Sequence, residues 1–255
     1  MTDSSSLQAV LGAEILEDLR GIARDDLLDA HIRARNWIAA PGTWLTGAER
    51  VAVVEETLQA ASCKLCRDRK DALTPYAVEG DHDSLGTLDD LRVEVIHRIA
   101  TDSGRLTGAW VDDLKTNGLS DGHYVEIVGL VAMTKMMDAF LWATGTTAAD
   151  MPAPKDGAPT GYRPPGAKMS SAWVPLVAPE DLMESDGELY GGTAGFVLQA
   201  LSLVPDSQRA FWALGQSHYI PMTEIRDPDT KVRAISRAQI EILAGRTSAL
   251  HGCMY

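Results

Sequence analysis

Helical periodicity runs along nearly the whole chain and constrains its fold more than any other feature. Apolar residues recur three and four positions apart in residues 6–40, 46–73, 87–102, 106–118, 120–145, 193–220 and 236–255. That spacing places them on one face of an α-helix. No convincing strand with period-two alternation interrupts the pattern. We therefore predict an all-α protein.

Cap signals mark several of these helices. Thr46 and Glu49 have capping-box spacing, in which the hydroxyl and the carboxylate each accept a hydrogen bond from a free backbone N–H. An acidic first turn follows Ser120, and Gly145 is a C-cap candidate. These signals predict helices that begin near residues 46 and 120.

A proline-rich segment divides the chain. Residues 150–187 hold seven of its twelve prolines, a composition typical of an extended connector. We expect Trp173 either to pin this connector onto a neighbouring element or to lie in a solvated linker. The predicted organisation is a complete helical domain at 1–150, a connector at 151–190 and an incomplete second repeat at 191–255.

Composition and charge exclude several partners. The net charge of −13 argues against nucleic acid and anionic membranes, because phosphate groups repel the chain. The most apolar stretch, 125–145, is broken by Glu126, Lys135 and Asp138, which indicates a buried helix rather than a membrane span. With no visible export signal, three cysteines favour a reducing compartment, the cytoplasm, and reactive thiols rather than a disulfide framework.

The last helical stretch matches the second one without a gap. Ser236 and Gln239 align with Thr46 and Glu49, and Cys253 aligns with Cys63. Helical patterning alone forces part of this likeness, so chance similarity is the alternative. In the first copy the chain continues as Cys63-Lys64-Leu65-Cys66, whereas the sequence stops at Tyr255, one residue before the position equivalent to Cys66.

A Cys-x-x-Cys pair can form a disulfide or bind a metal. Near a helix N-terminus the free N–H groups lower the thiol pKa; one thiolate can then attack and the other resolve the product as a disulfide. Zinc needs four ligands, a second Cys pair is absent, and His82 is the nearest downstream imidazole. We predict neither a metal nor an organic cofactor. The inert alternative is two small buried residues.

Residues 50–66 and 237–255 resemble the active-site helices of the AhpD-like family, which includes alkylhydroperoxidase AhpD and carboxymuconolactone decarboxylase. Residues 100–145 resemble the helical hairpin that completes that fold, and 201–215 resemble the start of its peroxidase-related branch. The resemblance implies an AhpD-like helical fold. It also implies a homo-oligomer, because single copies of such hairpins bury apolar faces between subunits.

The family's redox members place a Glu twelve residues before a Cys, a second Cys three further on and a His four beyond that. The resemblance implies that the Glu–His pair takes a proton from the second Cys, which attacks peroxide, and that the first Cys resolves the product. Glu241 precedes Cys253 by this spacing, so the second copy keeps a base and a resolving thiol. His251 is an assisting base or a surface histidine.

The first copy departs from that pattern. Val51 and Lys70 occupy the positions of the family's Glu and His beside Cys63 and Cys66. The positive charges of Lys70 and Arg67 could still lower a thiol pKa. Another base would have to come from Glu55, Glu56 or His82; as helix charges, Glu55 and Glu56 are expected to be solvated.

Two explanations fit the chain end. The sequence is a truncation that leaves half a motif, or selenocysteine follows Tyr255 and its codon was read as a stop. Some proteins of this family look like selenoproteins with a Cys-x-x-selenocysteine motif.

Three further histidines lie near acidic or apolar residues. His97 is interpreted as a structural histidine, and Asp81-His82-Asp83 as a polar loop rather than a metal cluster. His123 and Glu126 share a helix face and either line the thiol pocket or form a surface link.

The leading functional expectation is a cytoplasmic thiol peroxidase or disulfide reductase that uses a dithiol reductant to reduce hydroperoxides. The alternatives are a decarboxylase-like enzyme acting on a small lactone or acid, and an inactive scaffold. A redox site should show Cys63 and Cys66 within disulfide distance, partly exposed and beside a charged group.

Overall fold

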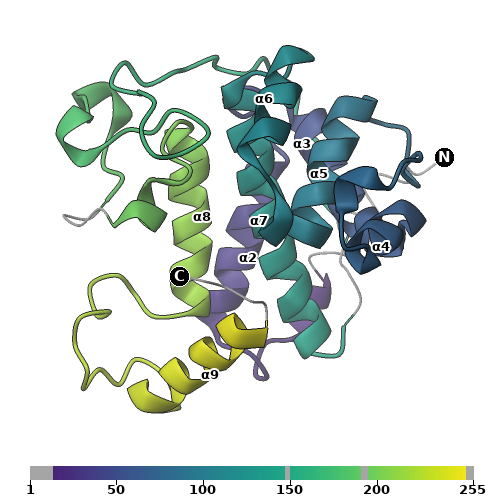
Figure 1. The fold of residues 1–255 in the computed structure, drawn as a ribbon. Helices are drawn as coiled ribbons and strands as arrows, with labels where there is room; N and C mark the ends of the chain where they lie inside the picture. The colour runs from purple at the N-terminus through teal and green to yellow at the C-terminus, as the bar shows by residue number, and fades with distance from the viewer. Residues whose placement is uncertain (1–13, 147–149, 191–194, 251–255) are drawn as a thin grey trace.

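The computed structural model describes residues 14–146, 150–190 and 195–250, and within these ranges it is helical without a β-sheet (Figure 1). This confirms the predicted all-α class. From Asp25 onward the α-helices are α2 (Asp25–Ile38), α3 (Gly47–Gln59), α4 (Lys64–Asp71), α5 (Asp90–Asp102), α6 (Gly108–Thr116), α7 (Asp121–Ala143), α8 (Pro205–His218) and α9 (Arg237–Leu250).

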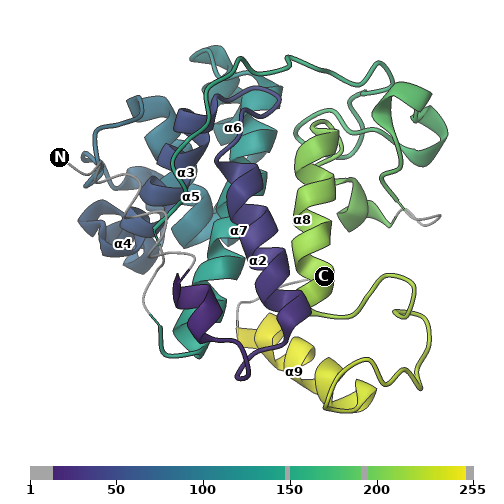
Figure 2. The ribbon, with the colours of Figure 1, turned by 180° about the vertical axis from the view of Figure 1, so that it is seen from behind.

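The long helix α7 forms the centre of the fold. Helices α3 and α5 pack against it and against each other, while α2 and α8 pack together beside it (Figures 1 and 2). Ile127, Leu130 and Met133 of α7 are fully buried in the core that these helices share. Burial of apolar side chains on both sides of α7 is the main force that holds the two groups of helices together.

The predicted caps form. The Thr46 hydroxyl accepts a hydrogen bond from Glu49 N, and the Glu49 carboxylate accepts one from Thr46 N, so the capping box of α3 is complete. Ser120 Oγ accepts from His123 N at the start of α7. Gly145 follows the C-terminus of α7 with φ 74°, the left-handed conformation that favours glycine.

The predicted helix over 46–73 is split where the thiols lie. After α3, one turn of 3₁₀ helix (Ala60–Ser62) ends at Cys63, whose extended backbone (φ −66°, ψ 125°) begins α4. Asp83 supplies the reason, because its carboxylate accepts a hydrogen bond of 2.7 Å from Lys64 N, at the first residue of α4. A partner outside the helix thus satisfies a terminal N–H group and stabilises the break.

The proline-rich segment is extended and is fastened to the helical body. Lys155 N donates to Ala39 O (2.7 Å) and Gly161 N to Thr43 O (2.7 Å). The indole of Trp173 covers Gly108 of α6 so closely that a Cβ there would lie 3.2 Å from it. Trp173 therefore contacts a neighbouring element, which confirms the first of the two expectations for it.

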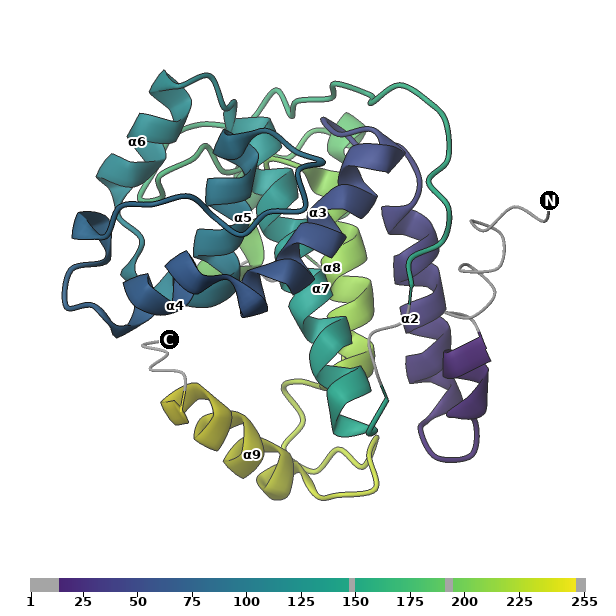
Figure 3. The same cartoon turned by 90° about the vertical axis from the view of Figure 1, so that its right-hand side faces the viewer.

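The region after residue 190 contributes to the same core. Helix α8 packs against α2 and α7 through Leu214, and the preceding Leu203 and Val204 are also fully buried. Helix α9 lies beyond the end of this body (Figure 3), and within Arg237–Leu250 only Ile240 is buried. The assignment of 191–255 as a second repeat stays a prediction, but α8 does not form a core of its own.

In the described part of the chain, none of the helices combines the length and the apolar character that crossing a membrane requires.

Arg50 of α3 and Glu126 of α7 form a fully buried ion pair, Nε to Oε1 3.4 Å. Arg50 also donates to Trp37 O (2.9 Å), and Glu126 accepts from Trp44 N (2.6 Å). Burial raises the pKa of Glu126, partly offset by the Trp44 N–H bond and the Arg50 charge. Glu126 therefore pairs with Arg50 near the start of α3, whereas Cys63 and Cys66 lie beyond the end of that helix. The expectation that Glu126 lines the thiol pocket is wrong.

We expect Glu126→Gln to destabilise the protein by about 3 kcal/mol, because Arg50 would remain buried without a charged partner. The measurement is the free energy of unfolding in urea at pH 7. Glu55→Gln on the exposed face of α3 is the matched control and should change that energy by less than about 0.5 kcal/mol. Equal effects of the two substitutions would contradict the assigned role of the pair.

Candidate thiol–imidazole site

Cys63, Cys66, His82 and His97 converge on one point. One ligand atom from each lies within 4.8 Å of those from the other three. The cysteines come from the start of α4, His97 from α5, and His82 from the loop between these helices; α3, α4 and α5 lie together in Figure 3. The fold therefore gathers residues that are up to 34 positions apart, from 63 to 97.

Cys63 is the N-cap residue of α4, and its sulfur accepts several hydrogen bonds. Asp83 N donates to Sγ at 3.4 Å, and His82 Nδ1 lies 3.5 Å away. Burial raises the pKa of the Cys63 thiol. Hydrogen bonds from the Cys66 N–H, His82 and the Asp83 N–H together lower it by more than burial raises it, so the pKa lies below the ordinary value of a thiol. Cys63 is thus prepared to carry a negative charge.

Cys66 lies against an imidazole that is held by a buried carboxylate. Its Sγ is 3.2 Å from His97 Nδ1, and His97 Nε2 is 2.8 Å from Glu56 Oε1. Because the Glu56 carboxylate accepts a hydrogen bond from the Nε2–H group, the neutral ring presents its Nδ1 lone pair to the thiol. Burial lowers the pKa of His97, although Glu56 opposes this shift. The arrangement is a Cys–His–Glu relay with His97 as the proton acceptor.

His82 forms a second imidazole–carboxylate pair. Its Nδ1 lies 3.5 Å from both sulfurs, and its Nε2 lies 2.8 Å from Glu94, which Arg69 also contacts at 2.8 Å. Burial lowers the pKa of His82, but the thiols and Glu94 raise it more, to about 10. Burial raises the pKa of Glu94, while His82 and Arg69 bring it down to about 2. A positive imidazolium therefore faces both sulfurs.

The loop that carries His82 is fixed at several points. Asp83 caps α4, and Gln59 Nε2 donates to the Asp83 carbonyl at 3.0 Å. Ser84 Oγ and Leu85 N both donate to Glu56 Oε2, at 3.2 and 3.1 Å. Glu56 therefore orients His97 with one oxygen and holds the His82 loop with the other.

Both thiols are buried, with Cys63 0% and Cys66 4% exposed. The expectation that they would be partly exposed is wrong, because the His82 loop covers them. The expected charged neighbours are present, because His82 and Glu94 pair beside the sulfurs. The two sulfurs lie within 4.8 Å of each other, and their approach to disulfide distance stays a prediction.

The remaining predicted site residues lie elsewhere. Lys70 and Arg67 are exposed on α4, and the cation that α4 places among the site residues is Arg69. Glu241 lies on α9, where it accepts from Tyr219 Oη (2.5 Å) and pairs with Arg237 (2.8 Å). Cys253, His251 and the proposed position of selenocysteine lie outside the described residues.

Glu56 is fully buried rather than solvated, so the expectation for it is wrong. His97 is fully buried, as expected of a structural histidine, but its Nδ1 also lies 3.2 Å from Cys66 Sγ, a contact that the sequence did not predict. A signal was present: Glu56 stands three residues after Val53 and next to Thr57, on the buried face of α3. His97 likewise follows Ile96 and Val93 on the buried face of α5. Ionisable residues on an apolar face are candidates for a site.

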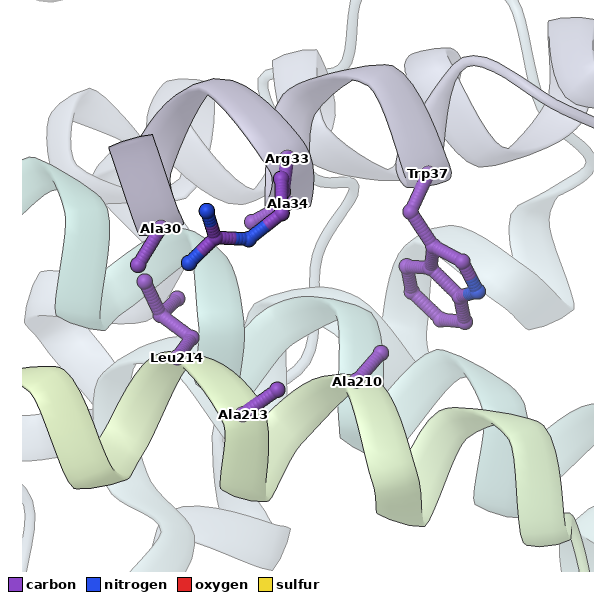
Figure 4. Close-up of a pocket in the computed structure, with 7 residues that line it drawn as sticks. All are labelled: Ala30, Arg33, Ala34, Trp37, Ala210, Ala213 and Leu214. Carbon is purple, nitrogen blue, oxygen red and sulfur yellow. The ribbon is translucent and has the colours of Figure 1, made fainter. Parts of the chain in front are cut away.

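A groove between α2 and α8 offers little chemistry by comparison. Figure 4 shows small and apolar side chains together with the guanidinium of Arg33 and the indole of Trp37. The lining residues are Ala30, Arg33, Ala34, Trp37, Ala210, Ala213 and Leu214. These residues include no nucleophile and no acid. The thiol–imidazole cluster is therefore the stronger candidate site.

Comparisons with protein-family models, with curated proteins and with solved structures found no match. The resemblance to the AhpD-like family therefore stays a prediction, and the function must be argued from the site.

Proposed function

We propose that this protein is a thiol peroxidase that reduces hydroperoxides at Cys66 and Cys63. The observation that carries the proposal is the relay from Cys66 Sγ to His97 Nδ1 (3.2 Å) and from His97 Nε2 to Glu56 (2.8 Å), with a second thiol beside it. The carboxylates and imidazoles gather at the thiols rather than away from them, which favours redox chemistry over the decarboxylase-like alternative.

The first step is the attack of Cys66. His97 takes the thiol proton, the Cys66 thiolate forms a bond to one peroxide oxygen, and the O–O bond breaks. The leaving alkoxide takes a proton from His97, so the products are an alcohol and a Cys66 sulfenic acid. Glu56 acts as a positioning residue because it orients His97 and stabilises the transient imidazolium.

The second step is resolution by Cys63. Its lowered thiol pKa favours the thiolate, which attacks the Cys66 sulfur and expels the hydroxyl group as water after protonation. The Cys63–Cys66 disulfide is then reduced by an external dithiol. The imidazolium of His82 lies 3.5 Å from both sulfurs and stabilises negative charge on either one.

The setting of this activity belongs to the same proposal. A dithiol that must be reduced in each cycle suits the cytoplasm. A homo-oligomer would cover the exposed apolar side chains of Trp142, Ile242 and Leu243, which are 82%, 70% and 58% exposed. Neither nucleic acid nor a membrane has a part in the proposed reaction.

The test is hydroperoxide consumption by metal-free protein with a dithiol reductant. Cys66→Ser should abolish consumption. Cys63→Ser should stop turnover but still release one equivalent of alcohol and leave a sulfenic acid at Cys66 that a dimedone probe labels, because attack precedes resolution.

Cys253→Ser is the control, since it removes the third thiol and leaves the Cys63–Cys66 pair intact. It should retain the activity. An unchanged rate in Cys66→Ser would overturn the proposal, as would activity lost only with Cys253.

A further inference from the structure

We infer that Cys63, Cys66, His82 and His97 form a closed tetrahedral site for Zn²⁺. The two sulfurs and the two Nδ1 atoms face a common centre, within 4.8 Å of one another, and no other described residues were found to gather metal-ligand atoms in this way. Two thiolates and two imidazoles are a common ligand set of structural zinc.

The distances fit a zinc-centred tetrahedron. Bonds of about 2.3 Å to sulfur and about 2.0 Å to nitrogen at tetrahedral angles separate each S···N pair by about 3.5 Å. Here His82 Nδ1 lies 3.5 Å from each sulfur, and His97 Nδ1 lies 3.2 Å from Cys66 Sγ. The longest separation among the four atoms is at most 4.8 Å, about 1 Å more than the S···S separation of about 3.8 Å in such a tetrahedron.

The groups behind the imidazoles match a metal site as well. Each ring presents Nδ1 to the centre and binds a carboxylate through Nε2: His82 to Glu94 and His97 to Glu56, both at 2.8 Å. A carboxylate behind each histidine fixes the ring and makes the ligand nitrogen more basic. A purely structural thiol pair would need neither carboxylate.

The fold explains why the sequence pointed away from zinc. A second Cys pair is absent, but the His82 loop and α5 supply the two missing ligands. Thiolate and imidazole together favour zinc over magnesium or calcium, which prefer oxygen ligands. Four protein ligands leave no open position, so the bound ion would close the site and mask both thiols.

This inference does not depend on the peroxidase reaction. Zinc binding needs two thiolates and a lone pair on each Nδ1, so it releases the protons that these four atoms hold, whereas peroxide reduction needs one thiol free to attack. Metal binding can therefore be measured without peroxide, and peroxide consumption can be measured without metal, so either idea can fail while the other stands.

The experiment begins with the full chain carrying Cys253→Ser, so that Cys63 and Cys66 are its only thiols. The protein is reduced, freed of metal with a chelator and titrated with Zn²⁺ against a chromophoric chelator. We expect one equivalent of Zn²⁺ per chain.

Two variants test the assigned ligands. His82→Gln should weaken Zn²⁺ binding at least about 100-fold, and Glu56→Gln should weaken it about 10- to 100-fold through His97. His123→Gln is the matched control, because His123 contacts Ser120 at the start of α7 and not the cluster. It should bind Zn²⁺ as tightly as the parent.

Cobalt substitution gives a readout that does not rely on any variant folding. Co²⁺ bound to the parent protein should show the intense visible bands of a tetrahedral ion and thiolate-to-metal charge transfer. Absence of stoichiometric Zn²⁺ binding by the parent, a weak octahedral cobalt spectrum, or equal affinity of the parent and folded His82→Gln would overturn the site.

Discussion

Replacing His97 with Gln should slow the reaction of metal-free protein with hydroperoxide by about 10²- to 10⁴-fold, the usual contribution of a general base. The reason is the contact of 3.2 Å between His97 Nδ1 and Cys66 Sγ, which gives the thiol proton a direct acceptor. The measurement is the second-order rate of peroxide consumption at pH 7. The rate should recover in part at alkaline pH, where hydroxide takes the proton that His97 no longer accepts.

Two further variants separate catalysis from a general loss of structure. Glu56→Gln should lower the same rate less than His97→Gln does and shift its pH profile, because Glu56 acts only through the imidazole. His123→Gln should leave the rate unchanged. If His97→Gln reacts at the wild-type rate while it keeps its helical circular dichroism, then His97 is not the base.

The sequence predicted the fold where local rules decide it. Apolar spacing gave the helices around the core, and the hydroxyls of Thr46 and Ser120 marked where α3 and α7 begin. The break at Cys63 was not predicted because it is stabilised from a distance in the sequence. The Asp83 carboxylate accepts a hydrogen bond from Lys64 N, which lies 19 residues earlier in the chain. Periodicity also shows which face of α8 is apolar, but not that α2 and α7 cover it.

The site was predicted only in part for the same reason. Cys63 and Cys66 are a local motif, so spacing alone identified them. Their partners are not local: His97 is 31 residues from Cys66, and Glu56 is 41 residues from His97. Charge alone made Glu56 look like a solvated residue, although its position among the buried residues of α3 carried the opposite information.

The same geometry serves both proposals because both need thiolates. A thiolate requires nearby positive charge or hydrogen-bond donors. In metal-free protein His82 and the N–H groups near Cys63 supply them, whereas with zinc bound the ion supplies the positive charge and His82 is one of its ligands. Zinc and a disulfide would occupy the same sulfur electron pairs, so the two states exclude each other. Assays of thiol reactivity therefore require metal-free protein, and assays of zinc binding require reduced protein.

A second histidine pair, remote from the thiols, makes stability depend on pH. His31 of α2 and His218 of α8 approach at 2.9 Å between their Nε2 atoms. Burial lowers the pKa of His31 to about 3, helped by the charges of His218 and Arg35; burial lowers that of His218 to about 4, helped by Arg24. A hydrogen bond between two ring nitrogens needs one lone pair, so both rings cannot be protonated.

Acidification from pH 8 to pH 5 should therefore destabilise the fold through this pair. In the unfolded chain a histidine binds a proton below about pH 6.5, whereas His31 and His218 in the folded protein do so only near pH 3 and pH 4. Because the unfolded state binds the extra protons, each histidine lowers the free energy of unfolding by about 2 kcal/mol between pH 8 and pH 5. In urea unfolding, His31→Gln should reduce the loss between these pH values by about 2 kcal/mol relative to wild type. Ser217→Ala, beside His218 on α8, should keep the wild-type pH dependence. Each protein is compared with itself at the two pH values, so any pH-independent cost of the substitution cancels. If the His31→Gln protein loses as much stability on acidification as the wild type does, the buried pair does not govern the acid response.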